Sequence, residues 1–401
     1  MHAQRLSQIP PYLFAAINRK KAALVAQGID VIDLGAGAPD RPAPRHILDA
    51  LHASAEDPTS HRYPPYDGTP AFKHAVAGWY DARFGVRLDP EREVLALIGS
   101  KEGLVHLVWA VADPGDVVLV PDPGYPAYAT AALMAGAEPV SVPLLSEKGG
   151  FPDLEALPPE VVKRAKLLFL NYPNNPTGAI ATLERFEEVI AWARRHGVRV
   201  AHDAAYAEIG FDGHVPPSIL QVPGASEVAV ELNSLSKSHG MAGFRVGMAV
   251  GNAELIAALA LLKSNVDTGV FKAVQDAAVA ALTGPQDHLP GWRSLYQERR
   301  DAAREGFASL GWPEVPCGGG FFLWLPTPGG RPSQAFAEEV MERCGVIVAP
   351  GAAYGLEGEG FFRVALVSEA ARIREAIARM AEAGIRFDAS ARGSSEDSAC
   401  S

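Results

Sequence analysis

The sequence predicts an α/β protein: a large domain with a mostly parallel sheet flanked by helices, followed by a smaller α+β domain. Short apolar runs typical of buried strands alternate with helical stretches between residues 93 and 250. Polar side chains directly follow several of these runs, as they do at the carboxyl edge of a parallel sheet. After residue 310 the pattern changes to short strands that surround a single helix. Together these observations predict two domains.

Length and composition agree with two domains of unequal size. The chain has 401 residues, of which 48% are hydrophobic and 21% charged, enough for one large and one smaller domain. We expect residues 1–45 to form an N-terminal arm and part of the small domain, and residues 46–285 to form the large domain. Residues 286–386 are expected to form the small C-terminal domain. Residues 387–401, rich in serine and small polar residues, are expected to form a disordered tail.

The charge balance favours a small-molecule ligand over nucleic acid or an anionic membrane. Lysine plus arginine number 36 and aspartate plus glutamate 47, which gives a net charge of −11, and no basic run is present. No apolar stretch approaches the roughly 20 residues of a membrane span, and residues 1–5 lack an apolar signal core. We therefore expect a cytoplasmic protein.

Metal chemistry and disulfides lack a sequence motif. The three cysteines have neither CxxC spacing nor an even count, and the eleven histidines are scattered without HExxH spacing. We therefore expect no metal site and no disulfide framework.

The first hundred residues predict two ligand-facing turns. A helix over residues 7–27 and a strand over 31–34 lead to Gly35-Ala36-Gly37-Ala38-Pro39-Asp40. This begins like a dinucleotide fingerprint, but Asp40 replaces the third glycine and nearby prolines block the helix that would receive a pyrophosphate. Gly37 either lets a ligand carboxylate approach backbone N–H groups or belongs to a plain turn.

A second turn follows the next predicted strand. The turn-rich residues 63–70 precede a helix over 71–84, and a strand over 93–98 leads to a helix over 103–112. Ser100 is a suitable N-cap for this last helix. The helix N-terminus either cradles a phosphate or is an ordinary capped end.

Three further strands deliver polar or aromatic residues at their carboxyl ends. Residues 117–120 lead to Tyr125, residues 167–170 to Asn175, and residues 198–201 to Asp203 and Tyr206. A helical stretch over 183–196 separates the last two strands, as expected for parallel neighbours. We therefore expect these side chains to gather at one edge of the sheet.

Lys237 lies between two apolar runs, residues 228–232 and 246–250, and is predicted to occupy a loop between two buried strands. Ser234 precedes the lysine by three residues and Arg245 follows it by eight. An amine held in this way suits a Schiff base to an aldehyde cofactor that carries a phosphate, which Ser234 and Arg245 would bind. The alternative is a solvated loop lysine.

The remainder of the chain predicts long helices and then the small domain. The predicted helices span residues 254–264, 270–282, 291–310, 333–344 and 370–384. The predicted strands span residues 318–325, 346–348 and 361–366.

Several motifs together resemble those of the class I/II aminotransferases, which use pyridoxal 5′-phosphate and share the aspartate-aminotransferase fold. They are Asn175-Pro176-Thr177-Gly178, Asp203-x-x-Tyr206, Ser234-x-Ser236-Lys237 with Arg245 eight residues on, and Arg363 in the last strand. The resemblance covers nearly the whole chain except the tail. It implies an aspartate-aminotransferase-like fold and a pyridoxal-phosphate enzyme that transfers amino groups.

The resemblance also implies roles at the reacting end of the cofactor. Lys237 forms the Schiff base and then moves a proton, and Asp203 keeps the pyridine nitrogen protonated, because a nearby carboxylate favours the cation. Tyr206 and Asn175 hydrogen-bond the ring's 3′ oxygen. Tyr125 stacks on the ring. Lys237, Asp203 and Tyr206 are therefore the implied catalytic residues.

The phosphate end of the cofactor is implied to bind several donors. Ser100 and Lys101 offer backbone N–H groups, Ser234 a hydroxyl and Arg245 a guanidinium, as a doubly charged phosphate requires. Tyr63 matches the tyrosine that reaches the phosphate of the neighbouring subunit. The resemblance therefore implies a two-fold homodimer with shared active sites.

For the substrate, the resemblance implies that Arg363 clamps the α-carboxylate through its fork of donors, which lysine cannot reproduce. The Gly37 backbone and Asn175 complete this substrate site. Arg41 departs from the family pattern, and its side chain is either solvated or in contact with substrate.

The substrate itself is indicated only by closer resemblance. Residues 63–68, 98–103, 120–126 and 263–271 are similar to segments of LL-diaminopimelate aminotransferases. This favours transfer between LL-diaminopimelate and 2-oxoglutarate, a step of lysine biosynthesis within amino-acid biosynthesis. Alternatives are aspartate, alanine or aromatic amino acids as donors, or a carbon–sulfur β-lyase on the same fold. A ligand-sensing domain of the kind found in bacterial regulators is disfavoured, because no basic patch or helix-turn-helix accompanies the motifs.

Overall fold

The computed structural model describes residues 3–9 and 13–388 of the chain. Its largest element is an eight-stranded sheet whose central strands β3, β6, β7 and β8 run parallel. β4 continues the parallel set, whereas β5 and β9 pair antiparallel with their neighbours. In spatial order the strands are β2 (Val94–Leu97), β9 (Gly247–Gly251), β8 (Ala229–Ser234), β7 (Arg199–Asp203), β6 (Ala165–Asn171), β3 (Val117–Asp122), β4 (Glu138–Leu145) and β5 (Phe151–Pro152). This confirms the predicted mostly parallel sheet.

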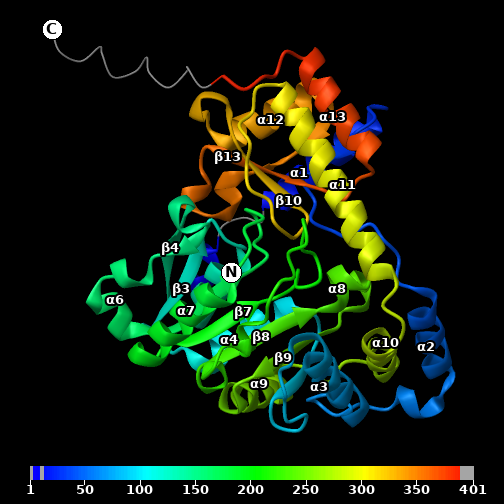
Figure 1. Ribbon diagram of the computed structural model, residues 1–401, viewed down its shortest axis with the longest axis vertical. Helices are drawn as coiled ribbons and strands as arrows, with labels where there is room; N and C mark the ends of the chain where they lie inside the picture. The colour runs from blue at the N-terminus through cyan, green and yellow to red at the C-terminus, as the bar shows by residue number, and fades with distance from the viewer. Residues whose placement is uncertain (1–2, 10–12, 389–401) are drawn as a thin grey trace.

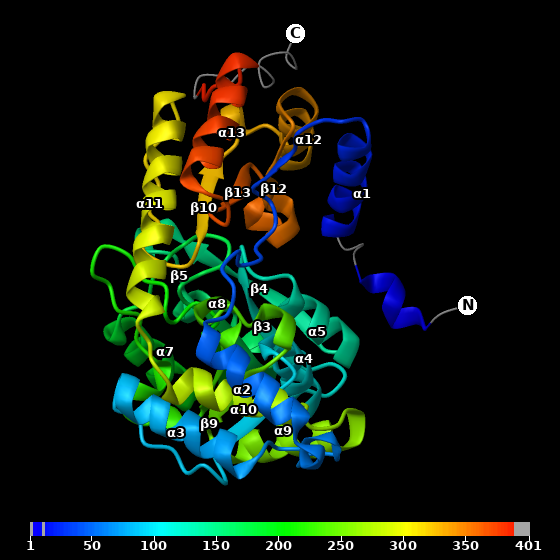
Figure 2. The same cartoon turned by 90° about the vertical axis from the view of Figure 1, so that its right-hand side faces the viewer.

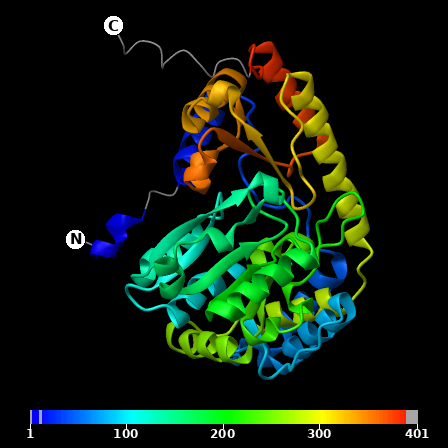
Figure 3. The ribbon, with the colours of Figure 1, turned by 60° about the vertical axis from the view of Figure 1, so that its left-hand side comes forward.

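Helices cover both faces of this sheet (Figures 1 and 3). Because both faces are covered, the central strands are buried almost throughout, and β3 and β6 read as mostly apolar runs. One apolar cluster joins the sheet to α4 (Ser100–Val111), α5 (Ala127–Ala135) and α9 (Ala253–Val266). A second cluster joins the opposite face to α7 (Leu183–His196). The short α6 (Pro159–Arg164) leads into β6.

Three helices pack beside the β2–β9 end of the sheet. α2 (Arg45–Glu56), α3 (Pro70–Phe84) and α10 (Lys272–Thr283) share one apolar cluster with β2 and β9. α3 illustrates how the sequence sets such ends: the Thr69 hydroxyl accepts the N–H of Phe72, Pro70 occupies the first turn, and Gly85 closes the helix at a left-handed φ of 68°.

A second group of elements lies above the carboxyl edge of the large sheet, and α11 (His288–Ser309) connects the two groups (Figure 1). This group contains two small sheets, the antiparallel β10 (Phe322–Pro326), β13 (Phe361–Ala365) and β12 (Ala349–Pro350), and the parallel pair β1 (Ile32–Asp33) and β11 (Val346–Ile347). α12 (Ser333–Cys344) and α13 (Ala370–Glu382) pack on them, with α1 (Leu13–Ala26) beside α12 (Figure 2). The domain boundaries at residues 45, 285 and 386 remain a prediction.

The structure corrects two local expectations. The N-cap of α4 is Gly99, with φ of 75° and no side-chain cap bond, so Ser100 is the first helical residue and not the cap. Lys237 lies between two buried strands as predicted, but in a one-turn helix, α8 (Leu235–Ser238), directly after β8, and not in a loop. The helix expected over residues 7–27 is α1 with a short 3-10 turn, Gln4–Gln8, before it; residues 10–12 lie outside the described residues.

Two further expectations concern the chain as a whole. Most of the predicted disordered tail, residues 389–401, lies outside the described residues. In the part of the chain that the structure describes, every helix is too short or too polar to cross a bilayer.

Candidate functional site

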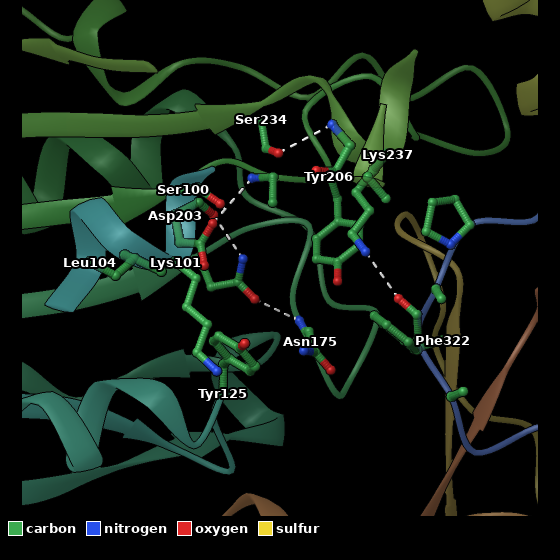
Figure 4. A pocket seen from close by; sticks show the side chains of 18 of the residues that line it. Ser100, Lys101, Leu104, Tyr125, Asn175, Asp203, Tyr206, Ser234, Lys237 and Phe322 are labelled. Atoms are coloured by element: carbon green, nitrogen blue, oxygen red, sulfur yellow. Dashed lines mark hydrogen bonds between the residues drawn. The ribbon is translucent and has the colours of Figure 1, made fainter. Parts of the chain in front are cut away.

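A pocket of about 420 Å³ lies where the carboxyl edge of the large sheet meets the upper elements. Its lining contains every predicted site residue except Tyr63: Gly37, Ser100, Lys101, Tyr125, Asn175, Asp203, Tyr206, Ser234, Lys237, Arg245 and Arg363. Figure 4 shows that the side chains of Lys237, Asp203, Tyr206 and Asn175 converge on this space, with Tyr125 and Lys101 facing them. Tyr63 lies outside it and is 89% exposed.

The parallel sheet explains the convergence. Asp203 ends β7 and Ser234 ends β8, and in register β7 pairs Asp203 with Asn171 of β6 and Leu232 of β8. Parallel strands end at the same edge, so residues far apart in sequence become neighbours there. Lys237 follows one turn after β8 and points back over that edge.

Lys237 is largely enclosed, and its Nζ donates a 3.0 Å hydrogen bond to the carbonyl oxygen of Gly37. Burial and the nearby guanidinium of Arg363 lower the pKa of Lys237 to about 8, because both disfavour the ammonium form. The opposing charge of Asp203 only partly offsets this lowering of the pKa. The side chain is therefore a primary amine poised to lose its proton.

Asp203 is a buried carboxylate with a partner that the sequence did not reveal. The Tyr128 hydroxyl donates to Asp203 Oδ2 at 2.8 Å, and the Ala205 N–H donates to Oδ1 at 3.3 Å. Burial raises the pKa of Asp203, and the bond from Tyr128 lowers it. Tyr128 itself stacks on Phe169 with ring centroids 4.6 Å apart. Tyr128 lies on α5, which was not predicted from the sequence, so this contact had no sequence signal.

An anion cradle is formed by the start of α4, the end of β8 and Arg245. The first N–H groups of a helix point outward and carry partial positive charge, so Ser100 and Lys101 present donors here. An added Cβ at Gly99 would lie 2.4 Å from Arg245 Nη2, so glycine is what admits the guanidinium beside the helix start. Arg245 itself adopts a left-handed φ of 55°, strained for a non-glycine residue.

Arg363 forms a second anion site opposite the amine. Its side chain is buried, with Nη1 donating to Asn175 Oδ1 at 2.8 Å and Nη2 to the Gly35 carbonyl at 2.7 Å. The guanidinium lies 4.1 Å from the centroid of the Phe322 ring, which restrains its plane. A planar fork held in this way suits a carboxylate.

Arg41 fits neither alternative that the sequence left open. It does not line the pocket and is not simply solvated, because it pairs with Asp40 at 2.7 Å and with Glu369. Elsewhere, Glu102, His106 and Asp267 each bring one ligand atom within 4.8 Å of the others. The Lys263 ammonium already lies among them, 3.1 Å from both Glu102 and Asp267.

The donor set fits a phosphorylated pyridine aldehyde. A lysine with a lowered pKa is a nucleophile toward an aldehyde, the Ser234–Arg245–α4 cradle matches a phosphate dianion, and buried Asp203 matches a ring nitrogen that carries a proton. The pocket therefore offers a primary amine, a cradle of anion donors and a guanidinium fork suited to a carboxylate.

The comparisons with known proteins agree with this fit. The sequence model of the family described as aminotransferase class I and II matches residues 29–380. A curated protein named LL-diaminopimelate aminotransferase, from Moorella thermoacetica, is 53% identical over 94% of this chain and 97% of its own length. The substrate-bound BacF structure from Bacillus subtilis matches with a TM-score of 0.94 at 36% identity, covering 97% of this chain and 99% of the other. A mutant aspartate aminotransferase from Thermus thermophilus matches with a TM-score of 0.89 at 30% identity, covering 96% and 99%.

Proposed function

The chain belongs to the class I and II aminotransferases, which depend on pyridoxal phosphate, and from this premise we propose that it moves the amino group of LL-diaminopimelate to 2-oxoglutarate. The observation that carries the choice of substrate is the 53% identity, over almost the whole of both chains, to a relative named for this amino donor. When bound, the cofactor supplies an aldehyde that condenses with amines and a cationic ring that withdraws electrons.

The side chains around the reacting atoms have distinct proposed tasks. The Lys237 amine would hold the aldehyde of the cofactor and would move a proton at the substrate Cα. Asp203, held by Tyr128, keeps a proton on the ring nitrogen. Tyr206 and Asn175 orient the ring through its 3′ oxygen.

The same pocket serves both substrates in turn. Arg363 binds the α-carboxylate that the amino acid and the oxo acid share, with Asn175 and the backbone around Gly37 fixing its fork. Tyr125 stacks on the ring, and Ser100, Lys101, Ser234 and Arg245 hold the phosphate, so the cofactor stays anchored while substrates exchange.

A second copy of the chain is proposed to complete the site, and the enzyme is proposed to act in the cytoplasm. Tyr63 and Tyr66 are 89% and 52% exposed, and Val266 and Phe271 are 52% and 46% exposed. The two segments touch, because an added Cβ at Gly269 would lie 2.3 Å from the Pro65 carbonyl oxygen. Such an aromatic and apolar surface suits a homodimer interface, through which Tyr63 reaches the partner's phosphate.

The lowered pKa of Lys237 predicts how fast the cofactor-free protein takes up pyridoxal phosphate. Only the neutral amine attacks an aldehyde, so the attachment rate should rise with pH and level off above about pH 8. An ordinary lysine would continue to gain reactivity up to about pH 10.4. Stopped-flow absorbance of the apoprotein mixed with cofactor measures this profile, and a rate still rising steeply above pH 9 would contradict it.

The substrate proposal is tested by a half-reaction screen. The holoenzyme is mixed with LL-diaminopimelate, its N-succinyl derivative, aspartate, alanine or phenylalanine, and loss of the cofactor's aldehyde absorption is followed. LL-diaminopimelate should convert the cofactor fastest. If it fails while aspartate or phenylalanine succeeds, the substrate is wrong and the aminotransferase stands. Release of an oxo acid without any amino acceptor would instead indicate the β-lyase.

A further inference from the structure

Arg299 is a fully buried charge with no part in the chemistry described so far. It lies on α11, its side chain is 0% exposed, and it does not line the pocket. Nη1 and Nη2 donate to the two carboxylate oxygens of Asp40 at 2.9 and 2.8 Å. Nη1 also donates to the Leu366 carbonyl at 3.3 Å. A buried guanidinium is costly unless it is paired in this way, so the arrangement calls for a reason.

Asp40 is the centre of a cluster of donors. Besides Arg299, it accepts bonds from Arg41 Nε and Nη2 at 3.0 and 2.7 Å, and the Tyr296 hydroxyl lies 3.4 Å away. Burial by itself would raise the pKa of Asp40, but the bonds from Arg299 and Arg41 hold it below its usual value. Arg299 and Arg41 therefore favour the ionised form of Asp40.

The position of this cluster connects two parts of the pocket. Asp40 directly follows residues 36–39, which line the pocket, and the carbonyls of Gly35 and Gly37 just before it accept bonds from Arg363 and Lys237. Arg299 also pairs with Glu369 at 3.1 Å, and its third acceptor, the carbonyl of Leu366, directly follows β13, the strand that carries Arg363. The Arg299 guanidinium thus binds the residue that follows the 35–39 segment and the residue that follows β13. These two segments position Arg363.

The residues that follow Lys237 pack tightly against residues 41–43, on the other side of Asp40. An added Cβ at Gly240, three residues after Lys237, would lie 2.6 Å from the Arg41 carbonyl oxygen and 2.8 Å from the Ala43 nitrogen. Gly240 has a φ of 65°, so other residues would also be strained there. A shift of Asp40 would therefore be transmitted to residues 36–39 and not absorbed locally.

We propose that the Arg299–Asp40 pair is a positioning device for the substrate carboxylate: it fixes residues 35–39 against the end of β13, so that Arg363 keeps the orientation needed to bind the α-carboxylate. The proposal rests on the proposed role of Arg363. In this proposal Arg41, which also donates to Asp40, helps to hold Asp40 in place from the solvent side. Because both substrates use one clamp, loosening it should weaken both to a similar extent.

The test compares substitutions of the acidic partners of two neighbouring arginines on α11, Arg299 and Arg300. Asp40→Asn keeps the shape of the side chain and removes its charge. Asp212→Asn does the same to the neighbouring pair, in which buried Arg300 binds Asp212 (2.9 Å from Nη2) and the Cys317 carbonyl (3.3 Å), away from the pocket. The measurements are KM for amino donor and oxo acid, kcat, cofactor affinity and thermal stability.

For Asp40→Asn we expect KM to rise about tenfold for both substrates, because small misplacements of a binding group cost up to about 10²-fold. The value of kcat should stay within about threefold and cofactor affinity should not change, since only shared substrate binding is lost. Asp212→Asn should lower thermal stability while leaving both KM values unchanged. Unchanged KM values in Asp40→Asn, or an equal rise in Asp212→Asn, would overturn the proposal.

Two further variants keep the test decisive. If Asp40→Asn does not fold, Arg41→Gln removes the partly exposed partner of Asp40 and Glu369 and should raise both KM values about twofold, a rise that Asp212→Asn must not reproduce. Asp40→Glu retains the charge and should recover part of the loss. Failure of the proposed function would give a different result. None of the amino acids tested would then convert the cofactor of the wild-type holoenzyme.

Discussion

Replacing Lys237 by alanine is expected to abolish measurable steady-state turnover, with a fall in kcat of about 10³-fold or more. The amine both holds the cofactor and carries the proton at the substrate Cα, and loss of a positioned acid–base group alone costs about 10²–10⁴-fold. Its amine donates a hydrogen bond to the Gly37 carbonyl and lies near the Phe321 ring, and neither contact joins two elements of the core, so its truncation should leave the fold intact. Steady-state assays with coupled detection of the product oxo acid measure the loss.

A suitable control is Lys166→Ala, because Lys166 is half exposed on β6 and outside the pocket. That variant should keep wild-type kcat. Wild-type turnover in Lys237→Ala would show that another group carries the proton.

Asp203→Asn is expected to slow the chemical step by roughly 10- to 150-fold while cofactor and substrate still bind. A hydrogen bond to a charged group is worth about 1.5–3 kcal/mol, and 1.36 kcal/mol corresponds to tenfold. A neutral amide no longer favours the protonated ring, so electron withdrawal weakens. The single-turnover rate with saturating amino donor reports this step without product release.

Tyr128→Phe should give a smaller effect in the same direction, about two- to tenfold, because it leaves the Asp203 carboxylate in place, removes only one hydrogen bond to it and keeps the stacking on Phe169. Tyr80→Phe is its matched control, since the Tyr80 hydroxyl donates to buried Glu231 away from the pocket. An unchanged single-turnover rate in Asp203→Asn would refute the role of the carboxylate.

The central strands of the fold were predicted from the sequence because apolar residues in each are followed directly by a polar residue. β6 and β7 are apolar runs that end in Asn171 and Asp203, and the amphipathic α7 was predicted with its observed ends. β4 was missed because it is only partly buried and contains Pro139 and Pro143. α5 was missed because it is apolar on every side and shows no helical period.

The residues of the site that belong to sequence motifs were predicted, whereas the long-range contacts that support them were not. The prediction of a pyridoxal-phosphate aminotransferase is confirmed by the family match and by the curated relatives. The individual roles came from motif resemblance, and the structure brings eleven of the twelve residues to one pocket. The contacts of Tyr128 with Asp203 and of Arg299 with Asp40 join residues 75 and 259 positions apart. Neither spacing nor periodicity carries that information, because tertiary packing decides it.

The measurement that tests the account most directly is borohydride reduction of the holoenzyme followed by mapping of the cofactor. Reduction traps the link between an amine and the cofactor aldehyde, and digestion with mass spectrometry locates it. We expect a single modified site, Lys237, and no modification when the enzyme is first converted by excess amino donor. Modification of another lysine with Lys237 unmodified, in an enzyme that is fully active before reduction, would contradict it.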